Sequence, residues 1–168
     1  MALVVEDGTG KSNADSFISV TDADAYFVNH GSPTAWTGLT TAQKESELRY
    51  AAVTLDGNWD WWGSITVITQ SLGWPRSGAE DAEGRSIATD VVPTRVKDAQ
   101  CELALLGTSN ALNSNYDRGG DVKREKVGPI ETEYFDGASM EPQLPIINRI
   151  LGGLGLRRGV VSGEVLRS

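Results

Sequence analysis

The apolar positions between residues 40 and 60 recur every three or four residues. They are Leu48, Ala51, Ala52, Leu55 and Trp59. Charged residues occupy the other faces, so this period predicts a helix with one buried side. Thr40 and Gln43 stand at the spacing of a capping box, which places the start of the helix near residue 40.

Two weaker helical patterns flank this one. Thr21 can cap a short helix that Gly31 and Pro33 end, which leaves Trp36 in a loop. Pro93 fits the first turn of another helix, which ends at a glycine at position 107. Its apolar stripe comprises Val96, Ala99, Leu103 and Leu106. The residues between 60 and 90 are rich in turn formers and predict irregular structure.

The last third of the chain mixes strand and helix signals. Residues 122–127 and 130–135 flank a Gly-Pro pair and predict a β-hairpin. The charges expected to face each other across it are Lys126 with Glu131 and Arg124 with Glu133. Prolines at 142 and 145 introduce a last helix, and the residues from 156 onward show no period. Such a tail is either disordered or becomes ordered on a partner.

These patterns predict a mainly α fold: a small bundle of about four helices with a β-hairpin and extended N- and C-terminal arms. At 168 residues the chain fits one domain. The expected segments are an N-terminal arm over 1–20, a helical core over 21–107, the hairpin over 121–136, the last helix over 143–155 and a C-terminal tail over 156–168.

Net charge and cysteine content narrow the function classes. The formal net charge of −8 disfavours general nucleic-acid binding unless the basic residues gather on one face. The single cysteine, Cys101, cannot form an intramolecular disulfide, and no stretch reaches the length of an apolar membrane span. The first residues lack signal-peptide features, so synthesis in the cytosol is expected.

The most enzyme-like motif is Gly10-Lys11-Ser12, which matches the end of a phosphate-binding P-loop. The full pattern needs a glycine five positions before Gly10, where this chain has Val5. Glu6 would also place negative charge where phosphates sit. A flexible polar turn is the better interpretation.

Other candidate groups also favour structural roles. His30 fits a helix end, where an imidazole meets the last carbonyls, and Cys101 fits a buried thiol. Asp56 and Asp60 are one helical turn apart, but nothing around them separates their pKa values. The tryptophans Trp59, Trp61, Trp62 and Trp74 could stack on bases, yet their acidic neighbours favour core or interface anchors. We expect no catalytic residue, no cofactor and no metal, and therefore no enzyme.

Several segments together resemble a known family. They are Leu-Val-Val-Glu-Asp-Gly-Thr-Gly at 3–10, Asn-Ala-Asp-Ser-Phe at 13–17, Leu-Gly-Trp-Pro-Arg at 72–76, the stretch 92–104 and Val-Lys-Arg-Glu-Lys-Val-Gly-Pro-Ile-Glu at 122–131. The resemblance spans roughly residues 3 to 155. The chain resembles a family of tailed-bacteriophage proteins that are called DnaT-like single-stranded-DNA-binding proteins. Members of this family look like head–tail adaptor, or head-completion, proteins.

The resemblance implies a virion subunit of the phage neck, assembled in the bacterial host cytoplasm. About twelve copies would form a ring between the portal protein and a tail-side neck, stopper or terminator protein. Packaged DNA would pass through this ring without sequence-specific binding, which suits an acidic subunit. The alternatives are a DnaT-like single-stranded-DNA-binding replication module and a degenerate nucleotide-binding enzyme.

Under the adaptor hypothesis, the tail and the β-prone segments make the contacts. The predicted portal contacts are Leu156, Arg157, Arg158, Val160, Val161, Val165, Leu166 and Arg167. The predicted contacts between subunits are Leu3, Val4, Val5, Lys123, Arg124, Lys126, Glu131 and Glu133. Exposed strand edges of this kind can pair with a neighbouring chain.

Overall fold

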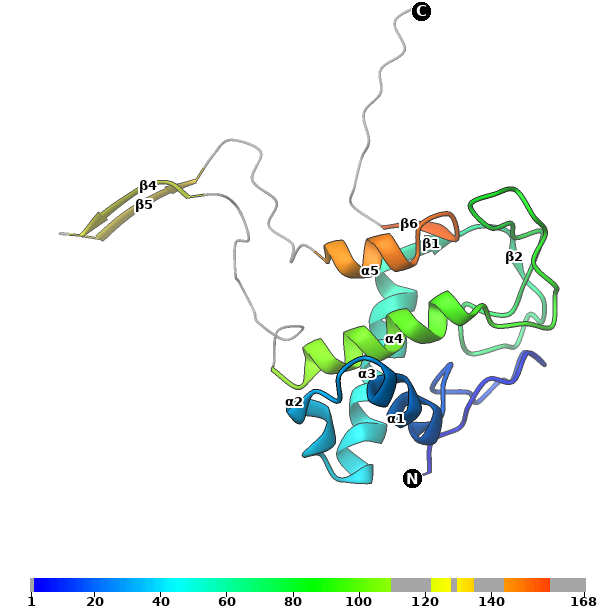
Figure 1. Ribbon diagram of the computed structural model, residues 1–168. Coiled ribbons are helices and arrows are strands. Elements are labelled where there is room, and N and C mark those ends of the chain that lie inside the picture. The colour runs from blue at the N-terminus through cyan, green and yellow to red at the C-terminus, as the bar shows by residue number, and fades with distance from the viewer. Residues whose placement is uncertain (1, 110–121, 128–129, 135–143, 158–168) are drawn as a thin grey trace, which may run out of the picture.

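A computed structural model describes residues 2–109, 122–127, 130–134 and 144–157 (Figure 1). The helices of this part are α1 (Val20–Asn29), α2 (Thr34–Thr37), α3 (Thr41–Asn58), α4 (Thr94–Gly107) and α5 (Pro145–Ile150). The strands are β1 (Trp59–Trp61), β2 (Ser64–Ile65), β3 (Arg76–Ser77), β4 (Val122–Val127), β5 (Ile130–Tyr134) and β6 (Gly155–Arg157). They form the antiparallel pairs β1–β6, β2–β3 and β4–β5. The expected helical fold with a small β component is confirmed in this coarse form.

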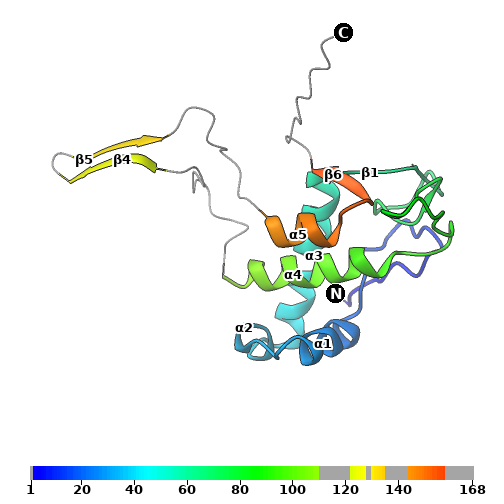
Figure 2. The same ribbon diagram turned by 45° about the horizontal axis from the view of Figure 1, so that its top comes forward.

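The core lies where α3 and α4 pack against each other. The buried residues of α3 are Leu48, Ala51, Ala52 and Leu55, and those of α4 include Val96, Ala99 and Leu103. Both predicted stripes are therefore confirmed, apart from Leu106, which is only half-buried. Short alanine side chains on both helices leave room for the backbones to approach. In two views α5 covers one side of α4 and α1 covers the other (Figures 1 and 2).

The helix ends follow the sequence signals with three corrections. The capping box of Thr40 and Gln43 is present. Ser19 rather than Thr21 caps α1, because its hydroxyl accepts the Asp22 amide N–H at 3.1 Å. Trp36 lies in α2 rather than a loop, where its buried indole donates to a carboxylate of α1 at 2.7 Å. The last helix is shorter than 143–155, since a turn at 151–154 replaces its end.

The predicted hairpin is present as β4 and β5. Lys126 pairs with Glu131 and Arg124 with Glu133, so the predicted register is confirmed. A register irregularity lies between Val122 and Arg124. The hairpin stands to one side of the helices in both views (Figures 1 and 2).

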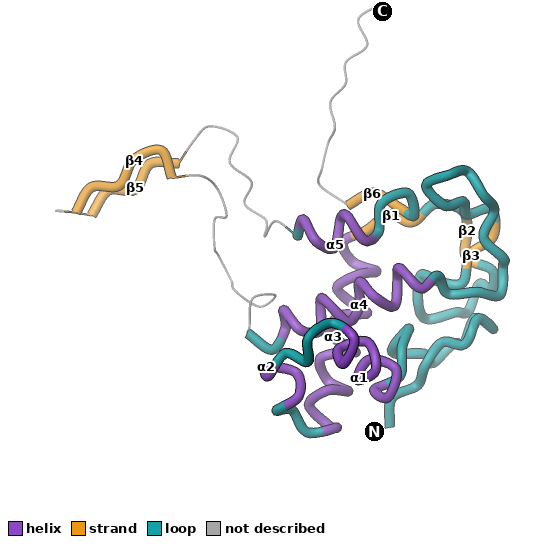
Figure 3. The backbone as a smooth tube through the Cα atoms, in the orientation of Figure 1, coloured by secondary structure: helices purple, strands orange, loops and turns teal. Residues whose placement is uncertain are grey.

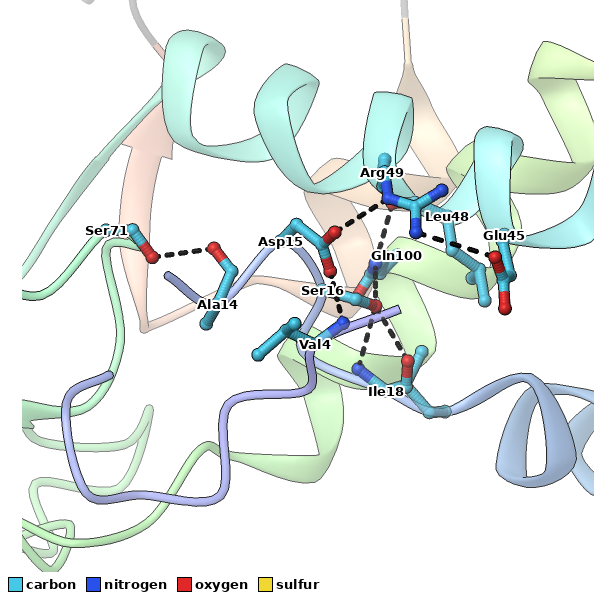
Figure 4. A network of polar contacts seen from close by, with 10 residues as sticks. All are labelled: Val4, Ala14, Asp15, Ser16, Ile18, Glu45, Leu48, Arg49, Ser71 and Gln100. Carbon is cyan, nitrogen blue, oxygen red and sulfur yellow. Dashed lines mark hydrogen bonds and ion pairs between the residues drawn. The ribbon is translucent and has the colours of Figure 1, made fainter. Parts of the chain in front are cut away.

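The N-terminal segment is not a free arm, which corrects the prediction for residues 1–20. Val5 forms a parallel bridge with Ser16, and the Asp15 carboxylate accepts the Val4 amide N–H at 2.7 Å (Figure 4). Arg49 of α3 holds the same carboxylate through its Nε at 2.7 Å. Buried Phe17 belongs to the core. Polar anchors at both ends therefore fasten this segment to the helices.

The C-terminal tail begins inside the fold. Residues 155–157 form β6, which pairs with β1 in the register Trp59–Arg157, Asp60–Leu156 and Trp61–Gly155 (Figure 3). The first two tail residues are thus part of a strand rather than of an extended arm. Within the described ranges, no helix has the length and apolar character needed to cross a membrane.

Candidate functional site

The tryptophans separate into a buried and an exposed group. Trp36, Trp59 and Trp74 are at most 1% exposed, while Trp62 is 47% exposed. Trp61 is half-buried and its indole N–H donates to Asp56 at 3.1 Å. Alternation along β1 (Trp59–Trp61) puts Trp59 and Trp61 on one face and Trp62 on the other, and the packing around the strand decides which face is buried. Of the two roles expected from the sequence, Trp59 and Trp74 are core anchors, and for the exposed Trp62 the role of interface anchor stays a prediction.

The backbone of Trp62 is held from two sides. Its N–H donates to the carbonyl of Leu154 at 3.0 Å, and its carbonyl accepts from Nε of Arg76 at 2.7 Å. The same guanidinium donates to the carbonyls of Gly63 at 2.6 Å and Gly73 at 3.0 Å. Burial lowers the pKa of Arg76, against an opposing effect of the Asp56 charge. The Arg76 guanidinium is therefore a structural clamp, and the indole of Trp62 projects from a fixed backbone.

Gly63 makes the turn that follows Trp62 possible. Its φ is +75°, and a Cβ at this position would lie 2.4 Å from the carbonyl oxygen of Ser77. Both the left-handed backbone and the close approach of the next strand require glycine. The Trp-Trp-Gly sequence thus places an aromatic side chain at a tight corner.

Beside Trp62 lies an open hollow of about 340 Å³. It is lined by Trp62, Gly78, Glu80, Asp81 and Gly153. The hollow joins three segments that are distant in sequence: the end of β1, the loop at 78–81 and the turn between α5 and β6. Two of the five lining residues have no side chain, so part of the surface is bare backbone that a flat group can approach.

Two arginines bind residues in or next to the lining of this hollow. Nε of Arg85 donates to Asp81 at 2.8 Å, and an Nη of Arg95 donates to the carbonyl of Gly152 at 3.1 Å. Asp81 also accepts the backbone N–H groups of Glu83 and Arg85, and these bonds, that of Arg85 foremost, lower its pKa. The lining carboxylate of Asp81 is therefore already paired, while both guanidinium groups reach the surface.

Charge is unevenly distributed along the chain. Residues 1–107 hold seven Lys and Arg against fifteen Asp and Glu, so the whole net charge of −8 lies there. The remaining residues hold eight of each kind. Arg95 is thus one of few basic residues in the acidic part, and it contacts the neutral C-terminal part. Residues 1–107 as a whole therefore repel an anionic ligand.

The acidic pair Asp56 and Asp60 lines a second hollow of about 350 Å³ next to Trp61. Asp56 accepts the N–H of Gly73 at 2.7 Å in addition to the Trp61 indole. This carboxylate therefore fixes the loop that carries Arg76. Its bonds agree with the structural role expected from the sequence.

The P-loop-like motif is filled by the protein itself. The buried Glu6 carboxylate accepts the N–H groups of Gly8 and Gly10 at 2.9 Å and of Lys11 at 2.7 Å. Lys11 is also paired with Asp7 at 2.8 Å. Successive N–H groups of this kind form an anion-binding nest. An internal carboxylate occupies this nest, at the segment where the sequence predicted a flexible polar turn.

The histidine and the cysteine have the predicted structural roles. Nδ1 of His30 donates to the carbonyl of Tyr26 at 2.7 Å, at the end of α1. Cys101 is buried, and desolvation raises the pKa of its thiol. Over the described ranges, no three His, Cys, Asp or Glu side chains are grouped so that they could hold a metal ion.

The predicted contact residues do not converge on one surface. Leu3, Val4 and Val5 are half-buried in the N-terminal segment, while Lys123, Arg124, Lys126, Glu131 and Glu133 lie on β4 and β5. Leu156 and Arg157 lie on β6, and Arg158, Val160, Val161, Val165, Leu166 and Arg167 fall outside the described residues. As contacts to portal or subunits they stay predictions.

Comparison with protein families gives one match. A family model described as "Putative DnaT-like ssDNA binding protein" matches residues 1–168, the entire chain. Searches among curated proteins and solved structures found no match. The family match overturns the prediction of a structural head–tail adaptor and favours the alternative, a single-stranded-DNA-binding module. The ring, its portal and tail-side partners and the virion location stay predictions from the sequence.

Proposed function

The chain belongs to the family of DnaT-like single-stranded-DNA-binding proteins, and on this premise we propose that it binds single-stranded DNA by stacking a base on Trp62. The observation that carries the proposal is the exposed indole of Trp62, which projects from a clamped backbone beside an open hollow. A base that stacks on an aromatic side chain contributes about 1–3 kcal/mol. A fixed platform loses little conformational freedom on binding, so more of this energy appears as affinity.

Arg85 and Arg95 supply the contacts to phosphate in this proposal. Arg85 is paired with Asp81 of the lining and with Glu83, and its side chain is 72% exposed, while Arg95 donates to the carbonyl of Gly152, next to the lining Gly153. Residues 1–107 carry the whole net charge of −8 and repel the phosphates of the strand. We therefore expect modest affinity that falls steeply as salt rises.

A binding role rather than a catalytic one is part of the proposal. The groups with inherent reactivity, Cys101 and His30, are used in the core and at a helix end. Glu6 occupies the anion-binding nest that a nucleotide would need. Each of these arrangements supports a passive role of the chain.

The experiment is a titration of a labelled oligonucleotide of about 16 nucleotides, followed by fluorescence anisotropy at low and moderate salt. Trp62→Ala should weaken binding by about tenfold, which corresponds to about 1.4 kcal/mol and lies within the range of one stacked base. The matched control is Tyr50→Ala, which removes an exposed aromatic side chain from α3. If the two variants lose equal affinity, or if Trp62→Ala binds like the wild type, the proposal fails.

A further inference from the structure

The hollow beside Trp62 combines one aromatic residue with two glycines. Trp62 lines it together with Gly78 and Gly153, which expose backbone rather than side chains. The φ of Gly153 is +87°, and a Cβ there would lie 2.7 Å from Ala82. The loop at 78–82 therefore packs directly on the turn before β6. A base stacked on Trp62 would place its edge against the lining residues of this loop.

Two carboxylates line the hollow, and they differ in their hydrogen-bond partners. Asp81 is engaged, since its oxygens accept from Arg85 Nε and from the N–H groups of Glu83 and Arg85. Glu80 lines the same hollow, and no side chain or amide within the described part of the chain hydrogen-bonds its carboxylate. Glu80 is therefore the lining group with lone pairs available to a ligand.

A carboxylate accepts hydrogen bonds and cannot donate them. Cytosine and adenine present an exocyclic amino group, which can donate a hydrogen bond to a carboxylate. Thymine has no amino group, and its two carbonyl oxygens flank a single N–H. A thymine edge placed against Glu80 would bring carbonyl oxygens toward a negative charge.

From this geometry we infer that the hollow selects bases with an exocyclic amino group, through acceptance by Glu80, and disfavours thymine. The inference rests on the proposed function, because it assumes that a base stacks on Trp62. It adds a selectivity that stacking alone does not supply, since every base has an aromatic face.

The test compares homopolymeric oligonucleotides of about 16 deoxycytidines, deoxyadenosines or thymidines at one salt concentration. The wild type should bind the cytidine and adenosine strands about five- to tenfold more tightly than the thymidine strand, within the discrimination that one base contact provides. In Glu80→Gln this difference should close, because an amide can donate to the thymine carbonyls. The control is Glu83→Gln, which removes an equal charge from the same loop and should keep the preference.

The possible failures are distinct. Equal binding of all three strands, with a loss in Trp62→Ala, would refute the base selectivity and leave the proposed function standing. A preference that persists in Glu80→Gln would refute the role of Glu80. If no strand binds, the proposed function fails and the selectivity fails with it.

Discussion

Nε2 of Gln100 on α4 donates a hydrogen bond to the hydroxyl of Ser16 at 2.8 Å, although the two residues are 84 positions apart. Figure 4 shows this contact, and both residues are fully buried. The same amide donates to the carbonyl of Leu48 at 2.8 Å and accepts the N–H of Phe17 at 2.9 Å. One polar side chain thus joins α4, α3 and the N-terminal segment inside an apolar core.

Replacing this amide should be costly. Gln100→Ala leaves the buried N–H of Phe17 without its acceptor, removes a donor from the Ser16 hydroxyl and opens a cavity, so the free energy of unfolding should fall by about 3 kcal/mol. Urea denaturation measures this change. Lys97→Ala, on the same helix, should stay within about 0.5 kcal/mol of the wild type. A loss of less than about 1 kcal/mol in Gln100→Ala would contradict the role assigned to the network.

Arg76 should affect DNA binding without touching DNA. Lysine keeps the positive charge but cannot donate to several carbonyls in a fixed fork, so Arg76→Lys should loosen the backbone of Trp62 and weaken DNA binding severalfold. The effect should disappear when Trp62 is already alanine, because the two residues act through one contact. Anisotropy titrations of the two single variants and the double variant measure this coupling. Additive losses would show that Arg76 acts elsewhere.

The salt dependence of DNA binding tests Arg95 separately. If its guanidinium neutralises one phosphate, Arg95→Gln should reduce the slope of log K against log salt by about 0.7. Lys44→Gln is the control, since this lysine is paired with Asp24 at 2.8 Å near the start of α3, whereas β1 and Trp62 follow the end of that helix. An unchanged slope in Arg95→Gln would place the phosphate contacts on another surface.

Glu6 should be needed for folding and should exclude nucleotides. In Glu6→Gln an amide nitrogen meets the N–H groups of the nest, so the free energy of unfolding should fall by about 2 kcal/mol. ATP should not raise the melting temperature of the wild type, nor of Lys11→Ala. A stabilisation by ATP that is lost in Lys11→Ala would revive the nucleotide-binding hypothesis.

The pH dependence of stability should carry a contribution from Asp98. Burial raises its pKa, the charge of His30 opposes this shift and that of Glu102 adds to it. Because the folded state favours the protonated carboxyl, ionisation costs stability as the pH rises above the unfolded value of about 4. Asp98→Asn should therefore match the wild type in acid and exceed it by about 0.5 kcal/mol at neutral pH, a small gain because solvent screens this half-buried group.

Thermal unfolding between about pH 3 and pH 7 checks this, since the range spans the ordinary carboxyl pKa. The control is Asp90→Asn, which changes an exposed carboxyl in the loop before α4. If Asp98→Asn were less stable than the wild type at neutral pH, the ionised Asp98 would stabilise the fold, which would contradict this prediction.

Local signals were enough to predict much of the fold. Helical spacing identified the buried faces of α3 and α4, and the Gly-Pro pair in the sequence predicted the register that pairs Lys126 with Glu131. These features depend on neighbours within a few residues, where period and turn chemistry act directly. The sequence also contained the conflict between Glu6 and a phosphate site.

Long-range packing decided the rest. The segment at 2–20 looked like an arm because its anchors, Arg49 and Gln100, lie far along the chain. Trp62 has the same local surroundings as Trp61, and only the pairing of β1 with β6 and the clamp of Arg76 turn its indole to the surface. The hollow exists because residues 62, 78–81 and 153 meet in space. The sequence by itself determined the buried faces of α3 and α4 and the pairing of the hairpin. The tertiary structure decided which tryptophan is exposed and what lies beside it, because burial depends on contacts that no local spacing encodes.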